Sequence, residues 1–197
     1  SARTLTGSGP GQWRHNGKSN GIVYLSGNVN EWNSGMRVLN GEIQIIENNN
    51  ASKLAINLGA ASTEWKAIDG ATGNLVTPDG LGTTVGTVKY ANSGTADYTL
   101  VISQWGAFGS IKNPSATKPV STVALNKLKA LGLFPMVDGS AAFGGDTIGF
   151  NFAIEAIPFR GGYWSSAATA GAFFLGLVSA RSNTSTSIGS RPAFVSL

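Results

Sequence analysis

Glycine content constrains this chain most: 27 of its 197 residues are glycine, spread from one end to the other. Glycine weakens the interior of a helix but suits tight turns and left-handed backbone. Serine, threonine and asparagine are also frequent, and they favour turns too. The composition therefore predicts short strands and irregular loops rather than long helices. The length fits one large domain or a domain with an insert, with enough chain to bury a core.

Charge and cysteine content narrow the classes of function. Charged residues make up 12% of the chain and hydrophobic ones 42%, which is typical of a globular protein. The chain has no cysteine, which excludes disulfides, thiolate zinc sites and a cysteine nucleophile. The net charge of +4 comes from scattered basic residues, so no nucleic-acid partner is expected. No apolar run approaches the roughly 20 residues that cross a bilayer, so no membrane insertion is expected.

Several segments carry clear secondary-structure signals. Asn40-Gly41 lies between two apolar runs and predicts a β-hairpin. Residues 121–131 predict a helix, capped by Ser121 or Thr122, with leucines 125, 128 and 131 on one face. Short β-prone runs follow one another between turn residues, at 21–25, 54–58, 87–90 and 98–103.

The segment near the C-terminus alternates in a way that matters for function. Between residues 173 and 178 the odd-numbered positions carry Phe or Leu, and the even-numbered ones carry Phe, Gly and Val. This period of two predicts a strand with the odd set facing the core and the even set facing solvent. From residue 160 onward the charged side chains are three arginines, without a carboxylate. Such a surface is similar in composition to an antibody paratope, although an uncharged sheet edge has the same composition.

Two groups of motifs resemble a known family. Gly27-Asn-Val-Asn-Glu-Trp32 is similar to the Gly-Asn-Val-Trp-Glu-Trp signature of the formylglycine-generating-enzyme family, a branch of the C-type lectin fold. Asn30 stands here in place of the first tryptophan. Three C-terminal motifs resemble the variable proteins of diversity-generating retroelements, in the same branch: Arg160-Gly-Gly-Tyr-Trp164, Ala180-Arg-Ser-Asn183 and Ile188-Gly-Ser-Arg191. Ser190 departs from this pattern, because the family often has an aromatic residue there. The resemblance covers roughly residues 10–50 and 125–195.

The resemblance implies an α+β, C-type lectin-type fold with a small twisted antiparallel sheet, few helices, long loops and a β-rich insert. Residues 1–197 are then a single domain, with the insert at about 50–120 and a variable ligand-binding region at about 160–191. Buried side chains are expected to hold the sheet: Trp164, Phe173, Leu175 and Leu177. Arg160, Arg181 and Arg191 are expected to bond loop carbonyls or a carboxylate such as Glu31.

In this family the template's asparagine codons become many other residues. The candidates for ligand binding are therefore the positions where the family pattern tends to show a template-encoded asparagine. They are Tyr163, Ser165, Ser166, Ala168, Phe174, Gly176, Val178, Ser179, Ser185 and Ser187. The eight from Tyr163 to Ser179 are expected to cluster on one solvent-facing surface.

The implied partner is a protein or glycan receptor on a target cell. The implied location is a virion, at a phage or viral tail or fibre tip, or a cell surface. Because one such face binds modestly, a homo-oligomer such as a trimer is expected. The alternative function is a structural virion or cell-surface assembly domain without a diversified ligand site, whose exposed aromatic residues contact other subunits.

An enzyme is not expected. The formylglycine-generating enzymes need active-site cysteines, which this chain lacks. His15 is the only histidine, and the carboxylates form no recognisable pair. The turn at residues 27–31 offers oxygens that calcium could use, but a structural turn is the favoured interpretation. No catalytic residue, metal or cofactor is therefore predicted.

Overall fold

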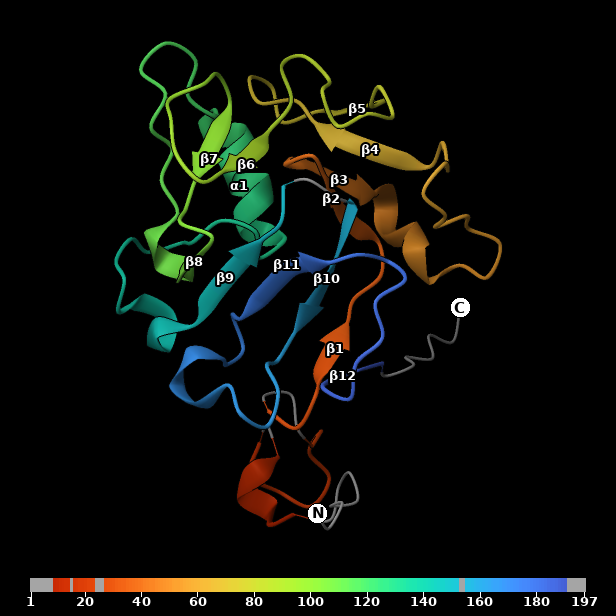
Figure 1. Cartoon of the computed structure of the whole chain (residues 1–197), viewed down its shortest axis with the longest axis vertical. Coiled ribbons are helices and arrows are strands. Elements are labelled where there is room, and N and C mark those ends of the chain that lie inside the picture. The colour runs from red at the N-terminus through yellow and green to blue at the C-terminus, as the bar shows by residue number, and fades with distance from the viewer. Residues whose placement is uncertain (1–8, 15, 24–26, 153–154, 191–197) are drawn as a thin grey trace.

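The sheet dominates the protein. The computed structural model describes residues 9–14, 16–23, 27–152 and 155–190 (Figure 1). Twelve strands join one sheet, whose main path runs β5-β4-β3-β2-β10-β11-β9-β8. Their bounds are β1 Asn30–Trp32, β2 Met36–Leu39, β3 Glu42–Ile46, β4 Trp65–Ile68, β5 Leu75–Val76, β6 Lys89–Ala91, β7 Thr99–Val101, β8 Trp105–Ala107, β9 Thr147–Phe150, β10 Glu155–Arg160, β11 Leu175–Ser179 and β12 Ile188–Gly189.

Most of the strand pairs are antiparallel, as expected. The parallel pairs are β1–β12, β6–β7 and β9–β11. Within the described residues the single α-helix is α1, Thr122–Ala130, and the other helical pieces are short 3-10 turns. A sheet-rich α+β fold with few helices is therefore confirmed, although the sheet has more strands than the small one expected.

The predicted hairpin is confirmed. Strands β2 and β3 pair antiparallel from Leu39↔Glu42 to Met36↔Ile45. The two residues between them, Asn40 and Gly41, have φ angles of 47° and 85°. Two successive residues in left-handed backbone match the twist of the flanking strands, which is why asparagine and glycine are favoured at this turn.

The predicted helix is confirmed as well. The Ser121 hydroxyl accepts a hydrogen bond from the Ala124 amide at 3.2 Å, and Gly132 ends the helix with a φ of 67°. Leu128 is fully buried against the sheet. Leu131 lies past the last helical residue and is largely exposed, so it does not share the buried face.

The stretch from 50 to 120 contributes strands to the same sheet. Strand β4 pairs with β3, and β8 pairs with β9. Strands β6 and β7 overlap two of the predicted β-prone runs, whereas residues 54–58 form no strand and Leu54 is exposed. Of the run at 21–25, Val23 forms an isolated bridge with Arg14, and residues 24–25 lie outside the described chain. That the stretch is an insert relative to a family stays a prediction.

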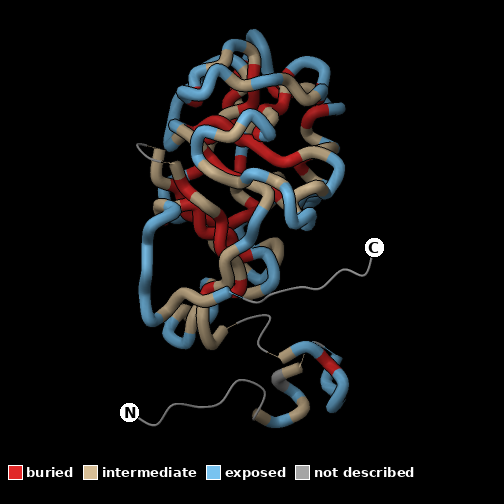
Figure 2. The backbone as a smooth tube through the Cα atoms, turned by 90° about the vertical axis from the view of Figure 1, so that its right-hand side faces the viewer, coloured by how far each residue is buried: buried red, intermediate tan, exposed pale blue. Residues whose placement is uncertain are grey.

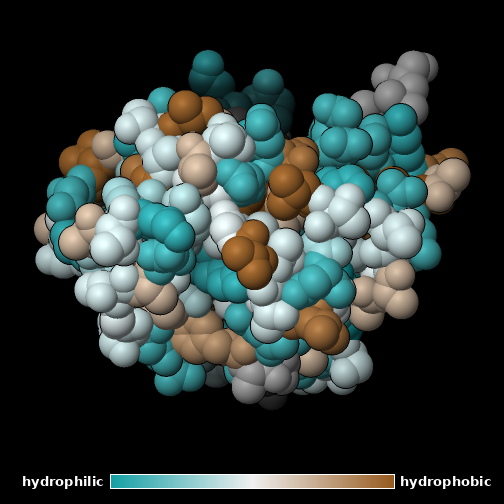
Figure 3. All heavy atoms as spheres, turned by 90° about the horizontal axis from the view of Figure 1, so that it is seen from above, coloured by the Kyte–Doolittle hydropathy of each residue, from teal (hydrophilic) through white to brown (hydrophobic). Residues whose placement is uncertain are grey.

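One apolar core lies between the sheet and α1. Figure 2 shows the buried segments gathered in the body of the molecule, while the N-terminal part lies at one end and is mostly exposed. Seen from above, the surface mixes hydrophilic and neutral side chains with scattered hydrophobic ones (Figure 3). The core draws on segments from Val38 to Leu177, including Val38, Ile43, Leu100, Leu128, Ile148, Leu175 and Leu177.

Candidate functional site

The segments that carry the family resemblance are neighbours in space. Strand β1 pairs antiparallel with β10 and parallel with β12. Outside these ladders, the Gly27 amide donates to the Gly161 carbonyl at 2.6 Å, and the Trp164 amide donates to the Asn28 carbonyl at 3.1 Å. The motif at 27–32 is thus bonded to the C-terminal motifs that begin at 160 and 188. These bonds join main-chain groups, so they do not depend on the side chains displayed there.

Strand β11 follows the predicted alternation on one face only. Leu175 and Leu177 are fully buried in the core, as predicted. The opposite face was expected to point to solvent, and this is wrong for Phe174 and Gly176, which are both buried. Ser179 was also expected on the solvent-facing surface, and this is wrong too, because it is only 7% exposed. A side chain at Gly176 would place its Cβ 2.1 Å from Cε2 of Phe159. The ring of Phe159, on the neighbouring strand β10, therefore covers this face.

A line of aromatic rings, here called the aromatic row, crosses this face of the sheet. It consists of Trp105, Phe174, Phe159 and Trp32. Trp105 and Phe174 have ring centroids 6.3 Å apart and nearly parallel planes, at 17°. Phe174 and Phe159 lie 6.0 Å apart, and Trp32 meets Phe159 edge-on at 5.8 Å. Trp105 stays 52% exposed, so the row ends in an open indole.

Glycine lets the indole lie close to the sheet. A Cβ at Gly149 would lie 2.5 Å from Cζ3 of Trp105. Since Gly149 pairs with Trp105 across β8 and β9, any larger residue there would push the indole away from the backbone.

A hollow of about 460 Å³ lies against the aromatic row. None of its described lining residues is charged, and they are Asn30, Trp105, Phe159, Tyr163, Phe174, Val178, Ser179, Asn183, Thr184, Ser185, Ser187 and Ile188. Six of the ten candidate positions are among them: Tyr163, Phe174, Val178, Ser179, Ser185 and Ser187. The structure therefore brings these six together, from a loop, a strand and a second loop.

The remaining candidates lie outside the hollow. Ser165 and Ala168 are exposed on the loop after β10, and Gly176 is beneath the Phe159 ring. Ser166 is half-buried, and its hydroxyl accepts a hydrogen bond from the Tyr163 amide at 3.0 Å. Ser166 thus has a structural part in this loop.

Two expected core residues are less buried than predicted. Trp164 is 76% exposed, so its prediction as a buried anchor is wrong. Gly161 and Gly162 adopt left-handed φ angles of 87° and 67°, and there the chain leaves strand β10 for the loop that carries Trp164. Phe173 is 36% exposed and packs on the ring of Phe143 at the margin of the core.

Polar groups form one part of the hollow's wall. The Asn183 amide donates to the Ser179 hydroxyl at 2.9 Å, and the hydroxyls of Ser185 and Ser187 lie 2.9 Å apart. The Asn30 amide nitrogen of the backbone donates to the Ser187 carbonyl at 2.8 Å. The side-chain oxygen of Asn30 is buried without a hydrogen-bond partner among the described residues.

Sequence reasoning missed Asn30 and Trp105 as lining residues. Asn30 replaces a family tryptophan, and this departure was the signal that could have marked the position. Trp105 lies more than fifty residues from the C-terminal motifs, and only the pairing of β8 with β9 brings it to the hollow.

Two arginines of the C-terminal part, Arg160 and Arg181, have structural partners. One Nη of Arg160 donates to the Gly132 carbonyl at 3.0 Å, as expected for a loop carbonyl. Burial lowers the pKa of the Arg160 guanidinium. Arg181 binds the carboxylate of Glu155 at 2.8 and 3.1 Å, where Glu31 had been named as an example. Arg191 lies outside the described residues.

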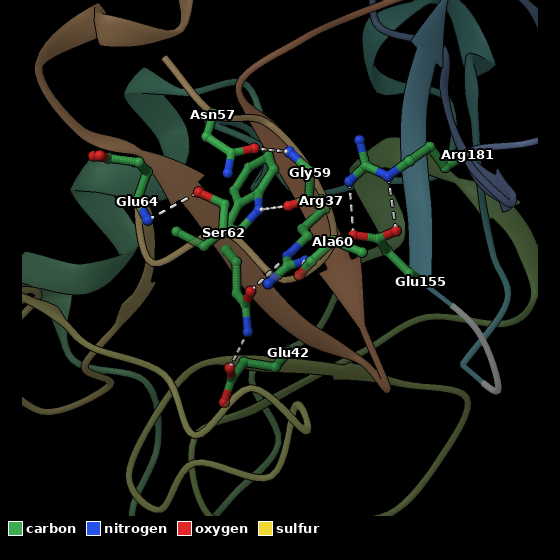
Figure 4. Close-up of polar contacts among 11 residues, drawn as sticks. Arg37, Glu42, Asn57, Gly59, Ala60, Ser62, Glu64, Glu155 and Arg181 are labelled. Carbon is green, nitrogen blue, oxygen red and sulfur yellow. Dashed lines mark hydrogen bonds and ion pairs between the residues drawn. The ribbon is translucent and has the colours of Figure 1, made fainter. Parts of the chain in front are cut away.

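A chain of buried polar groups crosses strands β10, β2 and β3 (Figure 4). The guanidinium of Arg37 contacts Glu155 at 2.7 Å, the Ala60 carbonyl at 2.7 Å and Gln44 at 2.7 Å. Gln44 donates in turn to Glu42 at 2.6 Å, and Thr87 donates to the same carboxylate at 2.7 Å. Arg37, Gln44, Glu42 and Thr87 are buried, Glu155 is partly buried, and each of these side chains is paired. Such pairing marks a structural network rather than an open reaction site.

The charges of this network are balanced. Burial lowers the pKa of Arg37, although Glu155 opposes that effect. Partial burial would raise the pKa of Glu155, but hydrogen bonds and charges from Arg181 and Arg37 outweigh it and hold that pKa below its usual value. The network therefore ties β10 to the hairpin in the ionised state of Glu155.

Other features of the described chain offer less for binding. Two hollows of about 440 and 450 Å³ lie near Met36, and neither contains any of the ten candidates. The described residues hold no group of three side chains that could ligate a metal, and His15 is outside them. Within the same residues, no helix is long and apolar enough to cross a membrane.

Comparison with known proteins adds no relative: the sequence matches no protein-family model, and no curated protein matches it.

Proposed function

We propose that this chain is a ligand-binding protein whose binding site is the hollow beside the aromatic row, carried on a C-type lectin-type scaffold of the retroelement-diversified class. One observation carries the proposal. Six of ten positions, chosen from a sequence pattern without any structure, line a single hollow. Those six are spread over residues 163 to 187, so a common location is not a trivial result of their being adjacent in sequence.

The way the hollow is built supports this role. A display surface must keep its backbone in place when its side chains change. Here the backbone is held by the buried Leu175 and Leu177 and by main-chain bonds such as Asn30 to Ser187. Ser185 is exposed, and Tyr163 and Ser187 are half-buried, so replacements at these positions have room.

The receptor-binding role rests on the same surface. A half-exposed tyrosine among small hydroxyl residues is a common composition for recognising other molecules. The partner we propose is a protein or glycan receptor on a target cell, bound from a virion tail or fibre tip or from a cell surface. Since burying one aromatic side chain stabilises a complex by only ~1.5–3 kcal/mol, several copies in a homo-oligomer would strengthen binding.

The DNA around the gene tests the proposal directly. We expect a reverse-transcriptase gene nearby and a near-identical template copy of the 3′ end. In that copy, the codons that correspond to Tyr163, Ser185 and Ser187 should contain adenines where the gene has other bases. The codons that correspond to Leu175 and Leu177 should show no such difference between the copy and the gene. If neither the reverse transcriptase nor the template copy is present, the alternative of a structural assembly domain takes precedence. In that alternative, the exposed aromatic residues would contact other subunits of the assembly.

A further inference from the structure

We propose that the hollow takes a neutral saccharide, with the open face of Trp105 as its stacking platform and the side-chain oxygen of Asn30 as a hydrogen-bond acceptor for a sugar hydroxyl. The inference rests on the proposed function and names the class of ligand for the same site. It commits to the glycan and not to the protein receptor.

The absence of charge in the described lining decides against a charged ligand. A phosphate, sulfate or carboxylate would leave water without meeting a cationic partner among the described residues that line the hollow. Burying an ionised group without a partner is costly. A neutral ligand meets no such penalty.

The aromatic end of the hollow suits a sugar ring. Trp105 is fixed from beneath by the backbone at Gly149 and from the side by the ring of Phe174. Trp105 is 52% exposed, and an indole offers a flat apolar surface for stacking. The C–H face of a pyranose is also flat and apolar, so the two surfaces can stack.

The polar end of the hollow suits hydroxyl groups. Ser179, Asn183, Ser185 and Ser187 supply hydroxyls and an amide, which can each donate and accept. Sugar hydroxyls also donate and accept, so they can pair with this set in several orientations. A platform at one end and hydroxyl partners at the other fit a ring that is apolar on its face and polar on its edge.

The unpaired side-chain oxygen of Asn30 indicates that the ligand carries a hydrogen-bond donor. A buried acceptor without a partner costs the protein stability, about 1–3 kcal/mol in general. Asn30 lines the hollow, and the last torsion of an asparagine side chain has a broad range. Turned towards the hollow, the oxygen would accept a hydrogen bond from a sugar hydroxyl. The unpaired oxygen is then the part of the site that the ligand completes.

The test uses the full chain on an array of immobilised saccharides. The array carries neutral glycans ending in hexose, deoxyhexose or N-acetylhexosamine, and acidic glycans ending in sialic acid, uronic acid or sulfated sugar. We expect binding to one or more neutral glycans. The strongest of these is then titrated by calorimetry against the protein and its variants.

Matched variants separate the site from general effects. Trp105→Ala should weaken binding by about tenfold or more, because it removes the platform. Trp164→Ala is the control, since Trp164 is exposed but does not line the hollow. It should leave the affinity within about twofold, a difference of less than ~0.5 kcal/mol. Asn30→Leu should also weaken binding by about tenfold, yet it should melt no lower than the parent because it removes an unpaired acceptor.

Three results would overturn the inference: no neutral glycan bound, acidic glycans bound alone, or equal losses in Trp105→Ala and Trp164→Ala. Suppose that a template copy and a reverse transcriptase lie beside the gene but the protein binds no saccharide on the array. The proposal of a diversified binder would then be retained and the saccharide site rejected. If the protein binds a neutral glycan but neither the template copy nor the reverse transcriptase is present, the saccharide site would be retained and the proposal of diversification rejected.

Discussion

Gly176 is the residue where a single added methyl group should have the largest effect on the C-terminal sheet. Its Cβ would lie 2.1 Å from Cε2 of Phe159, a ring that is itself buried between Trp32 and Phe174. We expect Gly176→Ala to lower the free energy of unfolding by about 1–3 kcal/mol, measured by urea denaturation.

A double variant identifies the cause of that loss. In a Phe159→Leu background the smaller side chain leaves room, so the cost of Gly176→Ala should fall to less than half. Additive losses would instead show that the ring collision is not the reason.

At the scale of single residues, period two predicted Leu175 and Leu177 correctly because a core face needs uniform apolar side chains. It was wrong for Phe174 and Gly176, because the rings of Trp105 and Phe159, which belong to other strands, cover the second face. Alternation states which residues share a face, but not what covers it. Trp164 was also wrong, since apolar character alone does not reveal that the chain leaves the sheet at Gly161.

At the scale of elements, helix α1 depends on its first turn. The Ser121 hydroxyl accepts from the Ala124 amide, and the Ser121 amide donates to the Gly70 carbonyl at 2.8 Å. Ser121→Ala keeps the main-chain bond and loses the cap, so we expect a loss of about 1 kcal/mol in thermal unfolding. Ser121→Asp should restore most of it, because aspartate caps as well as serine. Failure of that rescue would mean that the hydroxyl has another role.

The link between β10 and the hairpin should make stability depend on pH. Glu155 has a pKa below its ordinary value of 4.5 because Arg181 and Arg37 outweigh the effect of burial. A carboxyl with a lowered folded pKa stabilises the protein fully above its unfolded pKa, and that contribution is lost as the pH falls through the folded value. Glu155→Gln should therefore cost about 1–3 kcal/mol at pH 7, since the buried Arg37 loses its charged partner.

The melting temperatures of Glu155→Gln and the parent should converge as the pH is lowered below about 4. Arg181→Ala should cost less, about 0–1 kcal/mol, because Arg181 is on the exposed side of the pair. A gap between Glu155→Gln and the parent that stays constant down to pH 3 would contradict this account.

At the scale of the whole molecule, the sequence predicted local elements better than their assembly. The hairpin and α1 carry their own turn and cap residues, so both were found. The order of the sheet was not, because β8 and β9 are paired across about forty residues of loops and helix. Glu42 and Gln44 alternate with apolar neighbours, which suggests a solvent face, yet both are fully buried because the chain after β3 covers them.

The same division between core and surface predicts how the protein tolerates change. The triple variant Tyr163→Ser, Ser185→Tyr, Ser187→Asn alters the rim of the hollow, where none of the three side chains is buried. We expect its free energy of unfolding to stay within about 1 kcal/mol of the parent, as for other surface substitutions. Its affinity for the parent's ligand should change, because these side chains line the site.

Two single variants set the scale for that comparison. Leu177→Ala should cost about 2–5 kcal/mol, because Leu177 is fully buried between β9 and β10. Phe174→Ala should cost about 3–5 kcal/mol, since this ring is the floor of the hollow and only 5% exposed. Among the six hollow-lining candidates, Phe174 should therefore vary least and the rim most. If the triple variant unfolds as readily as Leu177→Ala, the rim is part of the folding core and cannot serve as a surface for diversification.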